Sequence, residues 1–201
     1  SYMASDLLWT KGEKVQPTSE VVKLPYRHLM AGVTVSLEKG SGFTDAEWTE
    51  YTKVIQIDNT ILSGTVDLTT GTCSVDSSMT EEMIVPRTYG QVWRALVFPQ
   101  TVESGKSLLT VAIDGQRYQL VKDADFTYYS GKMHNFTIAV NRTSETGELT
   151  FVLRADDILT WTDDVKPHDG LVRQYMVVEV LSAGSLQNKI ERMTNHNYAD
   201  I

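Results

Sequence analysis

The stretch LVFPQTVESGKSLLTVAIDGQRYQLVKD, residues 96–123, decides the fold class. Apolar residues take every second position of residues 109–113 and again of residues 118–120. This period of two is typical of strands that bury one face. Between the two runs lies Asp114-Gly115, a pair preferred in type I′ hairpin turns. The stretch therefore predicts two antiparallel strands joined by a two-residue turn.

The same alternation recurs along most of the chain. Apolar positions repeat with a period of two in several further runs, which are residues 22–26, 33–37, 62–68, 134–140 and 149–153. Turns separate strands of this kind about every ten residues in an antiparallel sandwich. The sequence thus predicts an all-β fold, an antiparallel β-sandwich with short helical turns.

Helical signals are confined to two segments. In FTDAEWTEY, residues 43–51, Thr44 is suited to the N-cap position and Glu47 would complete a capping box. The second segment is SAGSLQNKIERM, residues 182–193. Neither is long enough to change the fold class.

One apolar run changes phase along its length. The buried positions of residues 22–26 and of residues 33–37 differ by one, and Gly32 lies near the change. A shift of one residue moves the buried face to the other side of a strand. We therefore expect a bulge or kink between His28 and Gly32.

Composition excludes several classes of protein. The chain has 201 residues, 41% of them hydrophobic, and a net charge of -8 without a dense Lys/Arg patch, so it should fold but should not recruit nucleic acid or an anionic membrane. It has one cysteine and no apolar run of the roughly 20 residues that a membrane span needs. The first residues lack the layout of a signal peptide, and the last lack a terminating signal. We expect a piece of a longer protein, and these observations leave its compartment open.

No residue pattern indicates catalysis, a metal or a cofactor. The four histidines lack zinc-site spacing, and no G-x-S-x-G motif occurs. Cys73 has no basic neighbour in sequence that would favour a thiolate. The acidic run ADDILTWTDD, residues 155–164, could gather around calcium, but it lacks EF-hand spacing and is better explained as a solvated loop. We therefore predict that the chain is not an enzyme and has no cofactor.

Aromatic residues offer one alternative function. Trp48 and Tyr128 are candidates for stacking against sugar rings, which would make the protein a glycan-binding surface lipoprotein, although packing in the core is the favoured explanation for each ring. Trp93 lies in an almost wholly apolar run and is expected to be buried.

Several stretches together resemble the fimbrillin family of Gram-negative surface and fimbrial proteins. They are SDLLWTKGEKV at 5–15, VVKLPYRHLMAGVTVSLEKGSGFT at 21–44, LVFPQTVESGKSLLTVAIDGQRYQL at 96–120, YYSGKMHNFTIAVNRT at 128–143 and ILTWTDD at 158–164. The resemblance implies a transthyretin-like β-sandwich, the second of two in the family, with a lipoprotein signal preceding the first. It also implies a place at the cell surface or outer membrane, as a non-catalytic adhesion or fimbria-like structural subunit.

The resemblance and the turn-rich segment TDDVKPHDG together suggest three parts. Residues 1–20 would lead in from a preceding domain, residues 21–164 would form the sandwich, and residues 165–201 would hold a strand and a short helix. The last part is similar to the opening of a leucine-rich-repeat region.

The final strand, LVRQYMVVEVL at residues 171–181, is the candidate assembly element. Its apolar face would carry Val172, Met176, Val178 and Val180. Such a strand would either pair with its own sandwich or add to the sheet edge of another subunit by β-augmentation. The expected partners are other fimbrial or surface subunits, or ligands on a host or bacterial surface.

Overall fold

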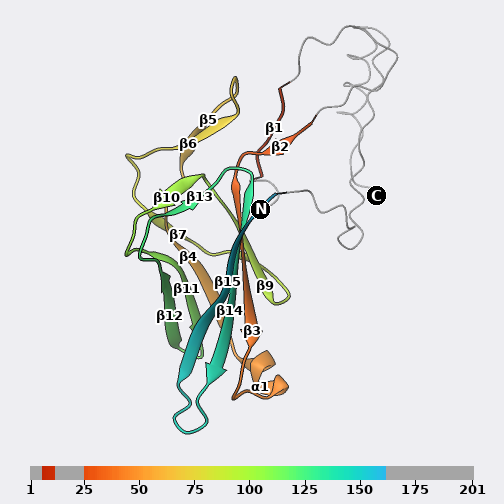
Figure 1. Cartoon of the computed structure of the whole chain (residues 1–201), viewed down its shortest axis with the longest axis vertical. Coiled ribbons are helices and arrows are strands. Elements are labelled where there is room, and N and C mark those ends of the chain that lie inside the picture. The colour runs from red at the N-terminus through yellow and green to blue at the C-terminus, as the bar shows by residue number, and fades with distance from the viewer. Residues whose placement is uncertain (1–5, 12–24, 162–201) are drawn as a thin grey trace, which may run out of the picture. The chain divides into compact units, whose positions relative to one another are not determined.

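The computed structural model describes residues 6–11 and 25–161 of the chain (Figure 1). Most strands belong to two sheets. The five-stranded sheet has the order β15 (Leu149–Thr160), β14 (Lys132–Arg142), β3 (Ala31–Lys39), β9 (Val92–Val97) and β8 (Arg87–Tyr89). The four-stranded sheet has the order β12 (Gln116–Val121), β11 (Ser107–Ile113), β4 (Lys53–Thr60) and β7 (Glu82–Ile84).

Three short strand pairs and one helix complete the described part. The pairs are β1 (Leu8–Trp9) with β2 (Arg27–His28), β5 (Gly64–Asp67) with β6 (Thr72–Val75), and β10 (Gln100–Val102) with β13 (Phe126–Tyr128). The helix is α1 (Asp45–Glu50). None of the described helical residues forms a segment long and apolar enough to span a membrane.

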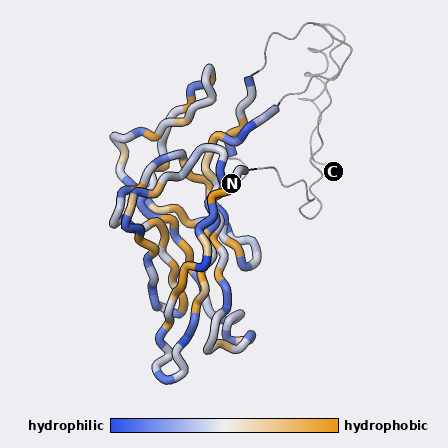
Figure 2. The backbone as a smooth tube through the Cα atoms, in the orientation of Figure 1, coloured by the Kyte–Doolittle hydropathy of each residue, from blue (hydrophilic) through white to orange (hydrophobic). Residues whose placement is uncertain are grey.

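The two large sheets enclose a common hydrophobic core. Figure 2 shows hydrophobic stretches concentrated in their strands. The core combines alternate residues of both sheets, among them Val33 and Val35 of β3, Phe136 of β14, and Leu109 and Val111 of β11. Trp93 is also buried, as its apolar surroundings predict. The prediction of an all-β sandwich is therefore confirmed.

One pairing departs from the expected antiparallel arrangement. Strands β3 and β14 lie side by side in parallel, with Val33 opposite His134 and Val35 opposite Phe136. Parallel neighbours require a long crossover connection. Here the whole of the four-stranded sheet lies in the sequence between them, so a local alternation pattern could not predict the pairing.

The predicted hairpin and its turn are confirmed. Strands β11 and β12 pair in antiparallel fashion up to Ile113 and Gln116, which leaves Asp114 and Gly115 as the turn. Both turn residues have positive φ, 49° and 78°. A type I′ turn requires this conformation at both positions, and Asp and Gly tolerate it best.

Between His28 and Gly32, where the sequence predicts a bulge or kink, the structure has a break between two strands. Strand β2 ends at His28 and β3 begins at Ala31, and each belongs to a different sheet. A Cβ on Gly32 would lie 2.2 Å from the sulfur of Met133, and the Trp161 ring lies against the same position. The close packing of these two side chains explains why glycine occupies this residue.

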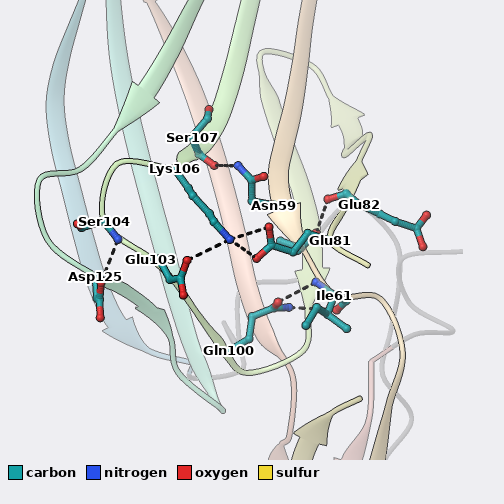
Figure 3. A network of polar contacts seen from close by, with 11 residues as sticks. Asn59, Ile61, Glu81, Glu82, Gln100, Glu103, Ser104, Lys106, Ser107 and Asp125 are labelled. Carbon is teal, nitrogen blue, oxygen red and sulfur yellow. Dashed lines mark hydrogen bonds and ion pairs between the residues drawn. The ribbon is translucent and has the colours of Figure 1, made fainter. Parts of the chain in front are cut away.

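Irregular pairing in β4 and β11 is compensated by side chains at one end of the four-stranded sheet (Figure 3). Asn59, which has a φ of 51°, donates a hydrogen bond to the Ser107 carbonyl over 2.7 Å. Asp58 accepts hydrogen bonds from the hydroxyls of Ser107 and Thr110 at 2.7 and 2.6 Å. Bulges free backbone groups that need other partners, and Asn59 supplies one to the Ser107 carbonyl, while Asp58 links the side chains of Ser107 and Thr110.

The neighbouring loops are held by a second set of polar contacts, also in Figure 3. Lys106 lies within 3.2 Å of carboxylate oxygens of Glu81 and Glu103. The Gln100 side chain accepts a hydrogen bond from the Ile61 N–H and donates one to its carbonyl. These contacts hold the loops to one another.

The predicted capping box begins helix α1. Thr44 accepts from the Glu47 N–H, and the Glu47 carboxylate accepts from the Thr44 N–H at 2.8 Å. This backbone hydrogen bond and the Arg142 guanidinium lower the pKa of Glu47 to about 2.

Replacing Thr44 with Ala should therefore lower the free energy of unfolding by about 1 kcal/mol, because the side-chain acceptor of the cap is lost. Urea denaturation measures the change. The control is Thr49→Ala in the same helix, where the hydroxyl only bonds back to the Asp45 carbonyl and little change is expected. Equal losses in the two variants would contradict a capping role for Thr44.

Candidate functional site

The free edge of strand β15 is the main candidate for an interaction site. Residues 149–160 form the longest strand, which pairs with β14 on one side and lies at the edge of the five-stranded sheet. Within the described ranges, no strand pairs with its other side. An edge of this kind offers main-chain N–H and C=O groups to an added strand.

The first half of β15 packs against β12, the neighbouring edge strand of the four-stranded sheet. The Phe151 ring stacks on Tyr118 of β12 with centroids 5.1 Å apart. The Leu149 N–H donates to the Gln116 side chain at 2.8 Å. The two edges thus meet through side chains, although β12 and β15 are not paired by main-chain hydrogen bonds.

The second half of β15 is irregular and more exposed. Thr137 pairs with Ala155 and Ile138 with Leu153, so Arg154 is an extra residue and forms a bulge. Beyond it, Asp156 forms an ion pair with Lys122, the residue that follows β12. Bulges and charges are common protections of a sheet edge against uncontrolled pairing. The regular stretch before Arg154 is accordingly the better place for an added strand.

The end of β15 is anchored to the N-terminal part of the described chain. The Trp161 ring stacks on His28 at 3.8 Å and within 3° of parallel, and the His28 Nδ1 lies 2.9 Å from an Asp6 carboxylate oxygen. The N–H of Trp161 donates to the Gly131 carbonyl. Sequence reasoning missed this cluster, because no periodicity connects residues so distant in the chain.

His134 lies beside the exposed half of β15. It is directly opposite Ile158 and buried, with aromatic rings of Phe126, Tyr128 and Tyr129 around it. Burial lowers the pKa of His134 to about 4. Its Nε2 accepts a hydrogen bond from the Tyr129 N–H at 3.0 Å, which requires this nitrogen to be unprotonated. His134 is therefore a neutral core residue at pH 7.

Both candidate sugar-stacking residues are buried. Tyr128 is fully buried, with Phe126 and His134 packed against its ring. Trp48 is also buried, in edge-to-face contact with Phe43 and beneath the ammonium group of Lys53. A stacking platform needs an exposed ring face, and core packing takes up both rings.

The residues of the candidate assembly strand, Val172, Met176, Val178 and Val180, lie outside the described residues. Within them, no group of three or more metal-ligating side chains comes together. Burial raises the pKa of the partly exposed Cys73 thiol, which disfavours the reactive thiolate.

Comparisons with known proteins agree with this architecture. The profile of a family described as fimbrillin-like matches residues 1–152. None of the curated proteins matches the chain. Among solved structures, a proposed cell adhesion protein of Bacteroides uniformis is 18% identical, with a TM-score of 0.53, and the match covers 70% of this chain and 54% of that one.

Two further structures are more distant. A proposed cell adhesion protein of Bacteroides ovatus is 18% identical with a TM-score of 0.45, and the match covers 70% of this chain and 48% of that one. The tip fimbrial protein Mfa3 from Porphyromonas gingivalis is 11% identical with a TM-score of 0.39, and the match covers 68% and 52%. The chain spans about half the length of all three structures. The profile match, by contrast, extends over most of the chain, which therefore belongs to the fimbrillin-like family.

Proposed function

We propose that this chain is a non-catalytic structural subunit of an adhesive or fimbria-like assembly at the cell surface. The observation that carries the proposal is that the outer edge of β15, a strand of 12 residues at the border of the five-stranded sheet, has no paired strand among the residues that the structure describes. Family membership supports the same role. In this function the protein is exported to the cell surface or outer membrane, and its partners are other surface subunits.

The edge would join subunits by β-augmentation. A strand added along Leu149–Leu153 would replace the Gln116 side chain as the acceptor of the Leu149 N–H, form main-chain hydrogen bonds with β15 and continue the sheet. The donor in this proposal is residues 171–181, whose alternating apolar face supplies side chains for burial. The same segment could instead close its own edge, and the two arrangements differ in how they depend on protein concentration.

The full-length Val178→Lys variant tests this assembly step. A charge placed in the apolar face of the donor disfavours pairing in either arrangement. If the strand closes its own sheet, the melting temperature falls by the same amount at every protein concentration. If it joins subunits, light scattering shows that an oligomer of the unmodified chain is lost.

Val177→Lys is the matched control, because Val177 belongs to the opposite face of the same alternating segment. It should leave mass and melting temperature close to those of the unmodified chain. If Val178→Lys changes neither quantity, or if both variants behave alike, residues 171–181 are not the assembly element.

A further inference from the structure

A row of polar side chains crosses the outer face of the five-stranded sheet. Successive pairings place five residues directly opposite one another, and residues opposite one another share a face of the sheet. The outer-face row consists of Arg87 on β8, Arg94 on β9, Thr34 on β3, Asn135 on β14 and Asp157 on β15. With strands about 4.8 Å apart, it extends over about 19 Å.

The two arginines form the positive end of this row. Arg87 and Arg94 are neighbours on adjacent strands, and their guanidinium carbons lie 5.2 and 5.6 Å from the centroid of the Tyr89 ring. Among the described residues, neither guanidinium forms an ion pair or a hydrogen bond, and the buried Nε of Arg94 has no hydrogen-bond partner. Like charges directly opposite one another are unfavourable. An anion held between them would remove this repulsion and accept hydrogen bonds from both planar groups.

The middle of the face is neutral and polar. Thr34 and Asn135 are followed one row further by Ser36 and Thr137, and all four side chains are half-buried. In the part of the chain that the structure describes, none of these side chains forms a hydrogen bond with another residue. Their hydroxyl and amide groups are available to a ligand that carries many hydroxyl groups.

The other end of the row carries the opposite charge. The exposed carboxylate of Asp157 ends the row on β15, and the chain as a whole has a net charge of -8. A densely charged acidic peptide or a nucleic acid would meet repulsion outside the arginine pair. A ligand whose single acidic groups are separated by neutral, hydroxyl-rich units fits this distribution of charge better.

The geometry points to an acidic polysaccharide as the ligand of this face. The arginine pair holds one carboxylate or sulfate group, and the side chains of Thr34, Ser36, Asn135 and Thr137 form hydrogen bonds with the adjoining sugar units. This inference goes beyond the assembly proposed above, because it uses the outer face of the sheet and not the edge of β15. If the polysaccharide inference fails, the assembly proposal is unaffected, and the reverse also holds.

Isothermal titration of the full chain with two defined oligosaccharides tests the inference. Hyaluronan provides carboxylates and no sulfate, whereas keratan sulfate provides sulfates and no uronic acid, so the two arms identify the acidic group. We expect one of them to bind, and we expect Arg94→Gln and Arg87→Gln each to weaken binding roughly tenfold, since each removes a charge-assisted contact. Carboxyl-reduced hyaluronan, which keeps the hydroxyl groups, should not bind.

The matched control is Arg117→Gln on β12, which changes the net charge equally but belongs to the other sheet. Its affinity should equal that of the unmodified chain, and thermal melts should show that all three variants remain folded. The inference is overturned if neither oligosaccharide binds at millimolar concentration, or if the Arg94 and Arg87 variants bind as well as the control. Binding of poly-glutamate with the same dependence on arginine would overturn it as well, because the ligand would then be an acidic peptide.

Discussion

Replacing Phe136 with Ala should lower the free energy of unfolding by about 3–5 kcal/mol. The side chain is 1% exposed and lies on β14, between β15 and β3. Its ring centroid is 5.7 Å from that of Phe126, so it fills the core next to β13. Removing the ring loses the free energy that is gained when the ring is transferred from water to the core. It also leaves a cavity that the closely packed strands on both sides cannot close.

Urea denaturation, followed by circular dichroism, measures this loss as a lower midpoint at an unchanged slope. Val152→Ala on the adjacent strand is the control. Val152 is 41% exposed and lies on the outer face of the sheet, opposite Ala139, so its truncation should cost about 0.5 kcal/mol or less. Similar losses in both variants would mean that Phe136 is not in the core between the two sheets.

Local features of the fold were predictable from short stretches of sequence. The Asp114-Gly115 turn and the Thr44 and Glu47 capping box depend on residues within a few positions of each other. Their conformations follow from backbone preferences and side-chain hydrogen bonds that act at this range. The alternating runs likewise predicted strands at 109–113 and 134–140.

Features that depend on distant pairings were not predictable in this way. Alternation identifies a strand but not its neighbour, so the parallel pairing of β3 with β14 was missed. The outer-face row depends on the registers of five strands, and its arginines are adjacent only because β8 folds back on β9. An alternating pattern also does not show which face is covered. Leu62 and Leu68, expected on a buried face, are exposed near the two-stranded β5–β6 pair.

The choice between burial and sugar stacking could not be made from sequence for the two candidate stacking residues. Tyr128 and Trp48 lie near turns in the sequence, where exposure is common. Both are enclosed by aromatic neighbours, Phe126 for Tyr128 and Phe43 for Trp48. Both rings belong to the hydrophobic core that strands of both large sheets build, and the sequence around each ring does not show this packing.

Acidification should destabilise the protein through His134 by about 2 kcal/mol between pH 7 and pH 4. In the folded chain burial holds the pKa of His134 at about 4, whereas an unfolded histidine titrates near 6.5. Between these values the unfolded chain binds a proton that the folded chain does not, so the free energy of unfolding falls as the pH falls. The full shift corresponds to about 3 kcal/mol, and partial solvent screening reduces the expected effect.

The variant His134→Gln isolates this contribution, because its side-chain oxygen can still accept the Tyr129 N–H but does not titrate. Urea denaturation of both proteins from pH 7 to pH 4 gives two curves of stability against pH. Carboxylates titrate in both proteins, so the difference between the curves belongs to His134. We expect the curves to converge toward pH 4, as the unmodified protein loses more stability than the variant.

The difference between the two stability curves also shows whether β15 keeps water away from His134. Ile158 of β15 is directly opposite His134, and the exposed half of the strand begins just beyond the bulge at Arg154. A low pKa requires that water be kept from the imidazole ring, and so requires β15 to be in place beside it. Parallel stability curves for the two proteins would mean that His134 is hydrated and that this half of β15 does not cover the core. The edge offered to an added strand would then be limited to Leu149–Leu153, before the bulge.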